Sequence, residues 1–279
     1  MYRTVITSLL MMGALAIGHA ADNTTPTQAT TKPTTPLQQT PAIPLQQPTP
    51  TQFTPEQVTA IQKIIRDYLV SNPSVLVEAS QALQQQTQQK QQQTAMKAIQ
   101  QNVAAIFQNP TDPMAGNPNG NVTLVEFFDY QCGHCKNVAS VIEDLVKKDS
   151  NLRVIFKELP IFGGDSQYAA KAALASMKQG ANKYYPFHSA LLKATTPLSK
   201  DKVLAAAKSV GLNVEQLKKD IEDPAILQQI RDNFKLAQAL QVAGTPTFVL
   251  GNKSFTQFKF IPGETSQQNL QDAISALQN

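Results

Sequence analysis

The sequence predicts an α/β protein in which a mixed sheet carries a helical insert and follows an N-terminal helical arm. Three observations predict this fold class: a strand pattern leads directly into a helical pattern, a long helical block follows a second strand, and strand patterns then return. The strand patterns occupy 122–128, 152–157, 247–250 and 255–260, and the helical patterns occupy 136–146, 166–240 and 264–277.

The first 53 residues are predicted to lie outside the folded part of the chain. Residues 1–20 have the pattern of a signal peptide, with Arg3, a short apolar run and a cleavage site after Ala20. An uncleaved anchor is the alternative. Residues 21–53 are rich in Thr, Pro and Gln and are predicted to form a disordered linker. Cleavage would release the rest of the chain into an oxidising compartment.

Residues 54–108 are predicted to form a helical dimerisation segment. Thr54 and Gln57 suit a capping box, and Pro73 marks a break between two helices. A narrow apolar stripe flanked by polar residues usually packs against a partner helix. We therefore expect a homodimer, and the alternative is that these helices pack on the main domain of their own chain. The stripe consists of Val58, Ile61, Ile65 and Leu69.

The chain has two cysteines, Cys132 and Cys135, separated by Gly133 and His134. A strand, a turn, this spacing and a helix are the arrangement of a redox-active dithiol. The helix N-terminus favours negative charge, so Cys132 is the expected attacking thiolate and Cys135 the resolving thiol. His134 is expected to add positive charge or a hydrogen bond beside that thiolate.

Half of a metal site is the alternative for this pair of cysteines. A closed zinc site usually needs four ligands, and this chain supplies few histidines near the cysteines. We therefore expect no metal and no cofactor in the monomer, whereas a metal shared between two subunits stays open.

Two further titratable residues stand in apolar surroundings. Glu126 lies inside the strand at 122–128, and a buried acid is unfavourable unless it has a partner or a function. Lys157 on the neighbouring strand is a candidate partner, and alternation could instead turn Glu126 to solvent. His188 follows a run of aromatic residues and is expected to be a packed histidine rather than a catalytic one.

Residues 125–135 and the separate segment 244–248, Gly-Thr-Pro-Thr-Phe, resemble the thioredoxin superfamily. The long helical insert resembles the DsbA-type branch. The resemblance implies a thioredoxin-like catalytic domain at 109–279 with an insert at 165–240. It also implies that Thr245 precedes a cis-proline, Pro246, and that this pair binds the substrate strand opposite the cysteines. An ordinary trans-proline is the alternative. By the same resemblance Glu126 would assist proton transfer at Cys135.

The two residues between the cysteines and the N-terminal extension refine this expectation. DsbA carries Pro-His at this place, whereas Gly-His resembles the protein disulfide isomerases, and the extension resembles DsbA-like proteins that dimerise. We therefore expect a periplasmic enzyme that forms and isomerises disulfides. The alternatives are a monomeric DsbA-like oxidase and a non-catalytic metal-binding or chaperone module.

The expected partners are unfolded or misoxidised secreted proteins and a membrane redox partner of the DsbB or DsbD type. A formal net charge of +4 without a dense cluster of Lys and Arg does not favour binding to nucleic acid.

Overall fold

The computed structural model describes residues 53–278, so the predictions for residues 1–20 and 21–52 concern parts of the chain outside this range. The chain divides into two units between Gln62 and Lys63, inside its first helix. Among the described residues, no helix combines the length and apolar character that a membrane span requires.

The helices are α1 (Pro55–Ser71), α2 (Ser74–Gln101), α3 (Val103–Phe107), α4 (Gly133–Lys148), α5 (Gly164–Ser176), α6 (Tyr184–Lys193), α7 (Lys200–Ser209), α8 (Val214–Asp220), α9 (Pro224–Ala239) and α10 (Gln267–Gln278). The strands are β1 (Met114–Gly116), β2 (Val122–Phe128), β3 (Leu152–Glu158), β4 (Thr247–Asn252) and β5 (Phe258–Pro262).

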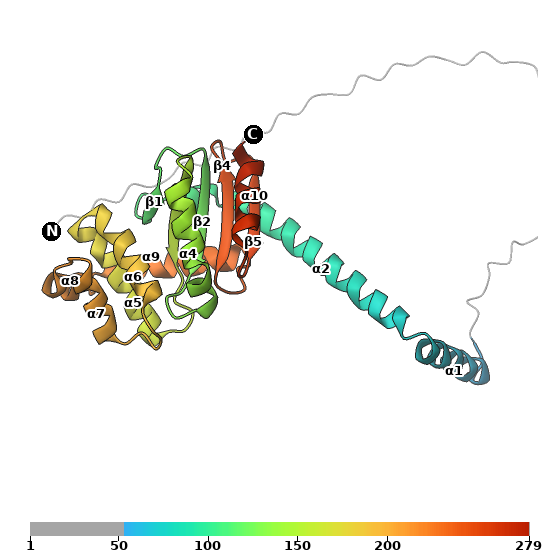
Figure 1. Ribbon diagram of the computed structural model, residues 1–279. Coiled ribbons are helices and arrows are strands. Elements are labelled where there is room, and N and C mark those ends of the chain that lie inside the picture. Colours follow the sequence, from blue (N-terminus) through green and yellow to red (C-terminus); the bar gives the residue numbers. More distant parts are fainter. Residues whose placement is uncertain (1–52, 279) are drawn as a thin grey trace, which may run out of the picture. The chain divides into compact units, whose positions relative to one another are not determined.

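The five strands form one mixed sheet in the order β1-β3-β2-β4-β5. Figure 1 shows the sheet, with β1, β2, β4 and β5 labelled. Strand β2 lies at the centre, parallel to β3 and antiparallel to β4. The order of strand, helix, strand, helical insert, two strands and a closing helix confirms the predicted fold class. The central position of β2 places its carboxyl end, where the two cysteines follow, between both neighbouring strands.

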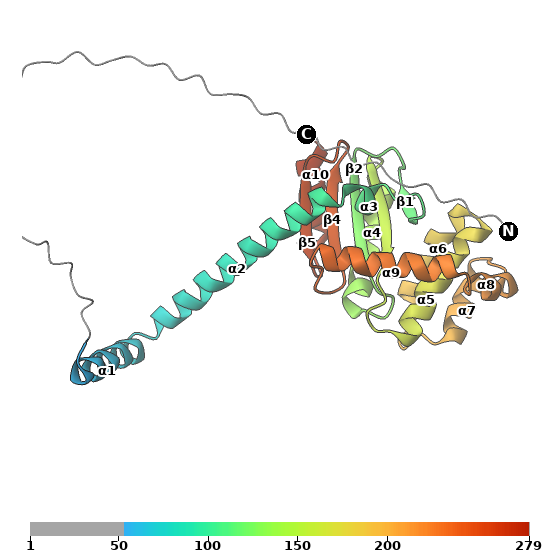
Figure 2. The same cartoon turned by 180° about the vertical axis from the view of Figure 1, so that it is seen from behind.

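Helices cover both faces of the sheet. Figures 1 and 2 show α4 and α10 on one face and α3 and α9 on the other. Leu124 and Phe128 belong to the core under α4, whereas Val125 and Phe127 belong to the core under α3 and α9. All seven residues of β2 are buried because successive side chains enter opposite apolar layers. A strand buried on both faces is a near-continuous apolar run, as the sequence indicated.

The helical insert comprises α5 to α9, and its predicted bounds at 165–240 stay a prediction. Side-chain caps begin three of its helices: Ser199 accepts from the backbone of α7, Asn213 from α8 and Asp223 from α9. These caps satisfy backbone donors that have no partner inside a helix.

The capping box predicted at the start of α1 is present. The Thr54 backbone N–H donates to Gln57 Oε1 at 2.9 Å, and the Gln57 backbone N–H donates to Thr54 Oγ1 at 3.3 Å. The chain breaks between α1 and α2 as expected, and Asn72 Nδ2 donates to Tyr68 O at the end of α1. The predicted domain boundaries at 53/54 and 108/109 stay predictions.

The sequence did not predict strand β1. Residues 109–120 are rich in Asn, Pro and Gly, which favour turns, yet Met114–Gly116 pairs antiparallel with β3. A strand of three residues is too short to show an alternating pattern, and its pairing partner lies far along the chain.

Candidate active site

The two cysteines lie at the N-terminus of α4, directly beyond the carboxyl end of the central strand. Cys132 is the N-cap residue of α4, with Gly133 as the first helical residue. Both cysteines are free thiols and both are buried. The backbone N–H of Cys132 donates to Asp129 O at 3.1 Å, which closes a turn between strand and helix. The dithiol therefore has the placement that the sequence predicted.

The loop before β4 contacts Cys132 directly. Cys132 Sγ donates to the backbone oxygen of Thr245 at 3.2 Å. The Thr245–Pro246 peptide bond is cis, as the resemblance implied. The contact follows from the sheet, because the antiparallel pairing of Phe127 with Thr247 brings the start of β4 to the end of β2. Pro246 has no amide N–H, and the loop holds a backbone carbonyl beside Cys132 Sγ.

Cys135 lies deeper than Cys132 and is completely buried. Burial raises the pKa of the Cys135 thiol, and the nearby charge of Glu126 raises it further. The neutral thiol is therefore its stable form in this structure, and a nucleophilic role for Cys135 requires a group that can take its proton.

Glu126 is buried within β2 with 2% of its surface exposed, so it does not turn to solvent. Burial raises its pKa to about 8. A carboxyl group with this pKa can hold or release a proton near neutral pH, as proton exchange with Cys135 would need.

The prediction that Lys157 pairs with Glu126 is wrong. In the parallel register of β2 and β3, Glu126 lies opposite Phe156, and Lys157 lies opposite Phe127. Laterally paired residues share a face of the sheet, so Lys157 projects from the face opposite to Glu126. There it forms a buried ion pair with Asp112 and donates to Ala105 O at 2.7 Å.

His134 lies on the exposed side of the dithiol. Its Nδ1 lies 2.6 Å from Glu264 Oε2, in the loop between β5 and α10. Asn137, one turn further along α4, donates to both oxygens of the same carboxylate at 3.2 Å. The hydrogen bond with His134 lowers the pKa of Glu264, and that with Asn137 lowers it further. Glu264 is not predicted from the sequence, because it lies 130 positions from His134 in the chain.

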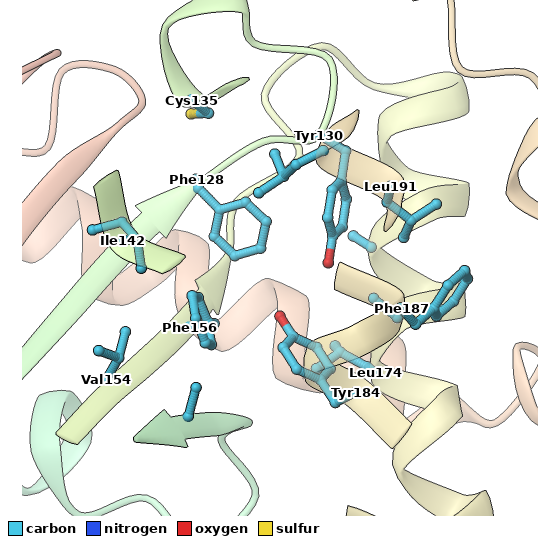
Figure 3. Packing of buried hydrophobic residues seen from close by; sticks show 14 of the residues in the cluster. Phe128, Tyr130, Cys135, Ile142, Val154, Phe156, Leu174, Tyr184, Phe187 and Leu191 are labelled. Carbon is cyan, nitrogen blue, oxygen red and sulfur yellow. The ribbon is translucent and has the colours of Figure 1, made fainter. Parts of the chain in front are cut away.

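His188 is buried at an aromatic cluster, as predicted, and it also belongs to a polar network. Tyr130, two residues before Cys132, has its hydroxyl 3.1 Å from His188 Nδ1 and donates to Glu158 Oε1 at 3.0 Å. The Tyr184 hydroxyl donates to the same oxygen at 2.7 Å. Figure 3 shows the two tyrosine hydroxyls pointing toward one another below Cys135.

Burial sets the charge state of this network. It lowers the pKa of His188 to about 3 and raises the pKa of Glu158 well above its usual range. Neutral forms of both groups are thus favoured under the turn that carries the dithiol. The burial of His188 is predicted from the sequence, whereas Glu158 is not. The signal that could have identified Glu158 is an acid at the end of a buried strand.

The helical insert is docked on the dithiol by residues that flank it. Lys136 Nζ donates to Leu192 O at 2.9 Å and to Ala194 O at 2.7 Å, at the carboxyl end of α6. Gln131 Oε1 accepts from the backbone N–H of Leu198 at 3.0 Å. A cation at a helix carboxyl end is electrostatically favourable, so the insert and the dithiol turn stabilise each other.

The family follows from a match to residues 123–275, which fit the model of a DSBA-like thioredoxin domain. The chain belongs to this family. Residues 57–90 match a second model, the N-terminal domain of the copper resistance protein ScsC. The matched segments include both cysteines and most of the two N-terminal helices.

Three solved structures illustrate the similarity. BcfH of Salmonella enterica Typhimurium is 32% identical, with 80% of this chain and 97% of that chain covered at a TM-score of 0.69. A thioredoxin-like oxidoreductase from Silicibacter pomeroyi DSS-3 is 40% identical, with 62% of this chain and 95% of that chain covered at a TM-score of 0.58. ScsC of Proteus mirabilis in a transitional conformation is 27% identical, with 81% of this chain and 99% of that chain covered at a TM-score of 0.59.

Curated relatives share only part of their length with this chain. The Na(+)/H(+) antiporter NhaA 1 of Salinispora arenicola (strain CNS-205) is 27% identical over 150 residues, 52% of this chain and 23% of the antiporter. Disulfide bond formation protein D of Bacillus subtilis (strain 168) is 25% identical over 156 residues, 52% of this chain and 70% of that protein. The chain thus spans less than a quarter of the antiporter.

Proposed function

We propose that this DsbA-like protein catalyses thiol–disulfide exchange through Cys132 and Cys135, and that it both forms and isomerises disulfides in secreted proteins of the periplasm. The observation that carries the proposal is the position of Cys132 Sγ. It lies at the N-cap of α4 and 3.2 Å from the carbonyl of the cis-proline loop. The helix N-terminus favours its thiolate, and the loop offers backbone groups to an extended substrate.

Reduction of a substrate disulfide would proceed in two exchanges. The Cys132 thiolate attacks one substrate sulfur, forms a mixed disulfide and releases the other sulfur as a thiolate. Cys135 then loses its proton and attacks Cys132 Sγ. A Cys132–Cys135 disulfide forms and the second substrate thiolate leaves. Substrate oxidation is the same sequence in reverse, so two electrons and two protons pass between the dithiol and the substrate.

The proton of Cys135 is the difficult part of this sequence, because burial favours the neutral thiol. We assign Glu126 as the acceptor of this proton. Its pKa of about 8 lies close to neutral pH, so its carboxyl group can exchange a proton there. His134 would act at the exposed side of Cys132, and Thr245 and Pro246 would pair with the substrate strand.

We further propose that the N-terminal helices mediate self-association, with a homodimer as the expected species. In α1 no residue is buried, and Ile64, Ile65 and Tyr68 are more than half exposed. Isomerisation would benefit from two dithiols in one assembly, because one substrate could then reach either. The proposed domains are a signal peptide at 1–20, a linker at 21–53, a dimerisation segment at 54–108 and a catalytic domain at 109–279.

We also propose the periplasmic location and the partners of the protein. One similar structure is described as a periplasmic thioredoxin-like protein from Salmonella enterica serovar Typhimurium. The substrates would be unfolded or misoxidised secreted proteins, and a membrane protein of the DsbB or DsbD type would restore the redox state of the dithiol.

Insulin reduction and the refolding of scrambled ribonuclease test the function with the full mature chain. We expect activity in both assays, and we expect Cys132→Ala to abolish both. Val138→Ala is the matched control, because it removes buried apolar atoms from the same helix and leaves the thiols intact. Full activity of Cys132→Ala would contradict the assignment, and insulin reduction without ribonuclease refolding would restrict the protein to redox transfer.

A further inference from the structure

Asp129 is a buried carboxylate between β2 and the dithiol that the proposed exchange steps do not use. Only 1% of its surface is exposed. A buried carboxylate is strongly unfavourable unless hydrogen bonds satisfy it. Asp129 accepts three from its surroundings: Gln131 N–H donates to Oδ1 at 2.7 Å, Ser166 Oγ donates to Oδ1 at 2.7 Å, and Phe162 N–H donates to Oδ2 at 3.2 Å.

These bonds join three segments that are distant in sequence. Gln131 lies in the turn before Cys132, Phe162 in the loop between β3 and α5, and Ser166 in the first turn of α5. Gly163 follows Phe162 with a φ of +66°, a backbone conformation that glycine adopts without strain.

The backbone of Asp129 supports the same turn as its side chain. Its carbonyl accepts from Cys132 N–H at 3.1 Å, while its side chain accepts from Gln131 N–H. An aspartate that bonds the backbone two residues ahead forms an Asx turn, which fixes the intervening dihedral angles. Both bonds act on the two residues that set the direction from which the chain enters α4.

We propose that Asp129 is a positioning residue of the dithiol, which fixes the turn ahead of Cys132 and ties that turn to the loop between β3 and α5. The proposal rests on the exchange function proposed above and adds a residue to it. Without the carboxylate, Gln131 N–H loses its acceptor and Cys132 Sγ is less firmly held at the helix N-terminus and at the Thr245 carbonyl. The attack by Cys132 then slows, because reactivity depends on a well-held geometry.

The direction of the redox change separates this role from a simple effect of charge. Looser positioning at the helix N-terminus stabilises the Cys132 thiolate less, so the dithiol becomes more reducing. Loss of the Asp129 negative charge alone would stabilise that thiolate and make the dithiol more oxidising.

The test compares Asp129→Ala with Asp129→Asn in the full mature chain. Asn keeps an oxygen that can accept from Gln131 and Ser166, although its Nδ2 cannot accept from Phe162 N–H, so we expect it to recover part of the rate. For Asp129→Ala we expect a fall of about tenfold in the saturating rate of attack on a disulfide peptide with little change in KM. In a glutathione titration, we expect the equilibrium constant between the dithiol and glutathione to change about tenfold, so that the dithiol becomes more reducing by about 30 mV.

Ser166→Ala is the matched control, because it removes one donor to Asp129 and leaves the turn intact. We expect the rate of attack and the glutathione equilibrium constant of this variant to stay within about threefold of the wild-type values. Should Asp129→Ala fail to fold, Asp129→Ser keeps one oxygen as an acceptor, and we expect an intermediate loss with a shift in the reducing direction.

The proposal is overturned if Asp129→Ala keeps the wild-type rate and potential, or if the Ala and Asn variants both become more oxidising. These results differ from a failure of the proposed function itself, in which the wild-type protein would show no exchange activity.

Discussion

The end of the sheet beside the dithiol differs from α1 in the contacts that its side chains make. The difference concerns both burial and hydrogen bonds. Around Cys132, apolar groups are buried, and Asp129, Tyr130 and Lys136 each find hydrogen-bond partners on other elements. In α1 no residue is buried, and Val70 is 73% exposed. Contacts within one chain therefore define the site, whereas contacts within the described chain do not account for the exposed apolar residues of α1.

This difference predicts that redox chemistry and assembly can be separated by mutation. Changes beside Cys132 should alter exchange and leave association intact, and changes on α1 should do the reverse.

The largest effect is expected at Cys135. In Cys135→Ala the first exchange can occur but the second cannot, so a mixed disulfide through Cys132 should accumulate and turnover should fall at least about 1,000-fold. Non-reducing electrophoresis and mass spectrometry after incubation with a disulfide substrate measure the trapped complex. Equal trapping in Cys132→Ala would show that Cys132 is not the attacking sulfur.

The next effect concerns the pH dependence of stability and Glu126. Its carboxyl has a pKa of about 8 in the folded protein, against about 4.5 in the unfolded chain. Between these values the folded state binds one more proton, so the free energy of unfolding falls as the pH rises, by about 5 kcal/mol for this group alone. Glu126→Gln should remove that fall.

Urea unfolding of the wild type and of Glu126→Gln at intervals from pH 5 to 8.5 measures this difference. Glu158, whose pKa is also raised, contributes a fall of the same sign in both proteins, so only the difference between the two curves is diagnostic. Parallel curves would show that Glu126 does not hold its proton in the folded state.

A smaller effect is expected on association. Ile65→Glu places a charge on an apolar residue of α1 that is 53% exposed, and it should weaken self-association about 100-fold while the potential of the dithiol stays unchanged. Light scattering over a range of concentrations measures it. Thr59→Glu adds the same charge about 120° around the helix from Ile65, outside the apolar stripe, and should leave association intact. Monomeric wild-type protein would refute self-association, and a larger assembly would correct its stoichiometry.

The smallest effect is expected at the exposed pair of His134 and Glu264. Their side chains are 70% and 40% exposed, and exposed polar contacts of this kind contribute little because solvent screens them. Glu264→Gln keeps an acceptor for His134 and should move the glutathione equilibrium by no more than about threefold. A tenfold shift would place this pair among the main determinants of the potential.

Local patterns were sufficient to predict most elements and the dithiol, but they could not predict how distant residues meet. The strand at 122–128 and the cap at Cys132 follow from apolar patterning and from the motif itself. The error over Lys157 arose because its face depends on the register between β2 and β3, which a single strand does not reveal. Glu264 and the partners of Asp129 escaped prediction for the same reason, since the loops that hold them are brought together only by the completed sheet.

A redox titration of the wild-type mature chain against glutathione tests the central claim most directly. We predict one reversible two-electron transition that requires both Cys132 and Cys135, with a potential between about −180 and −120 mV, the range of isomerases and strong oxidants. No reversible transition would contradict a redox role for the dithiol, and a potential below about −230 mV would contradict an enzyme that forms and isomerises disulfides.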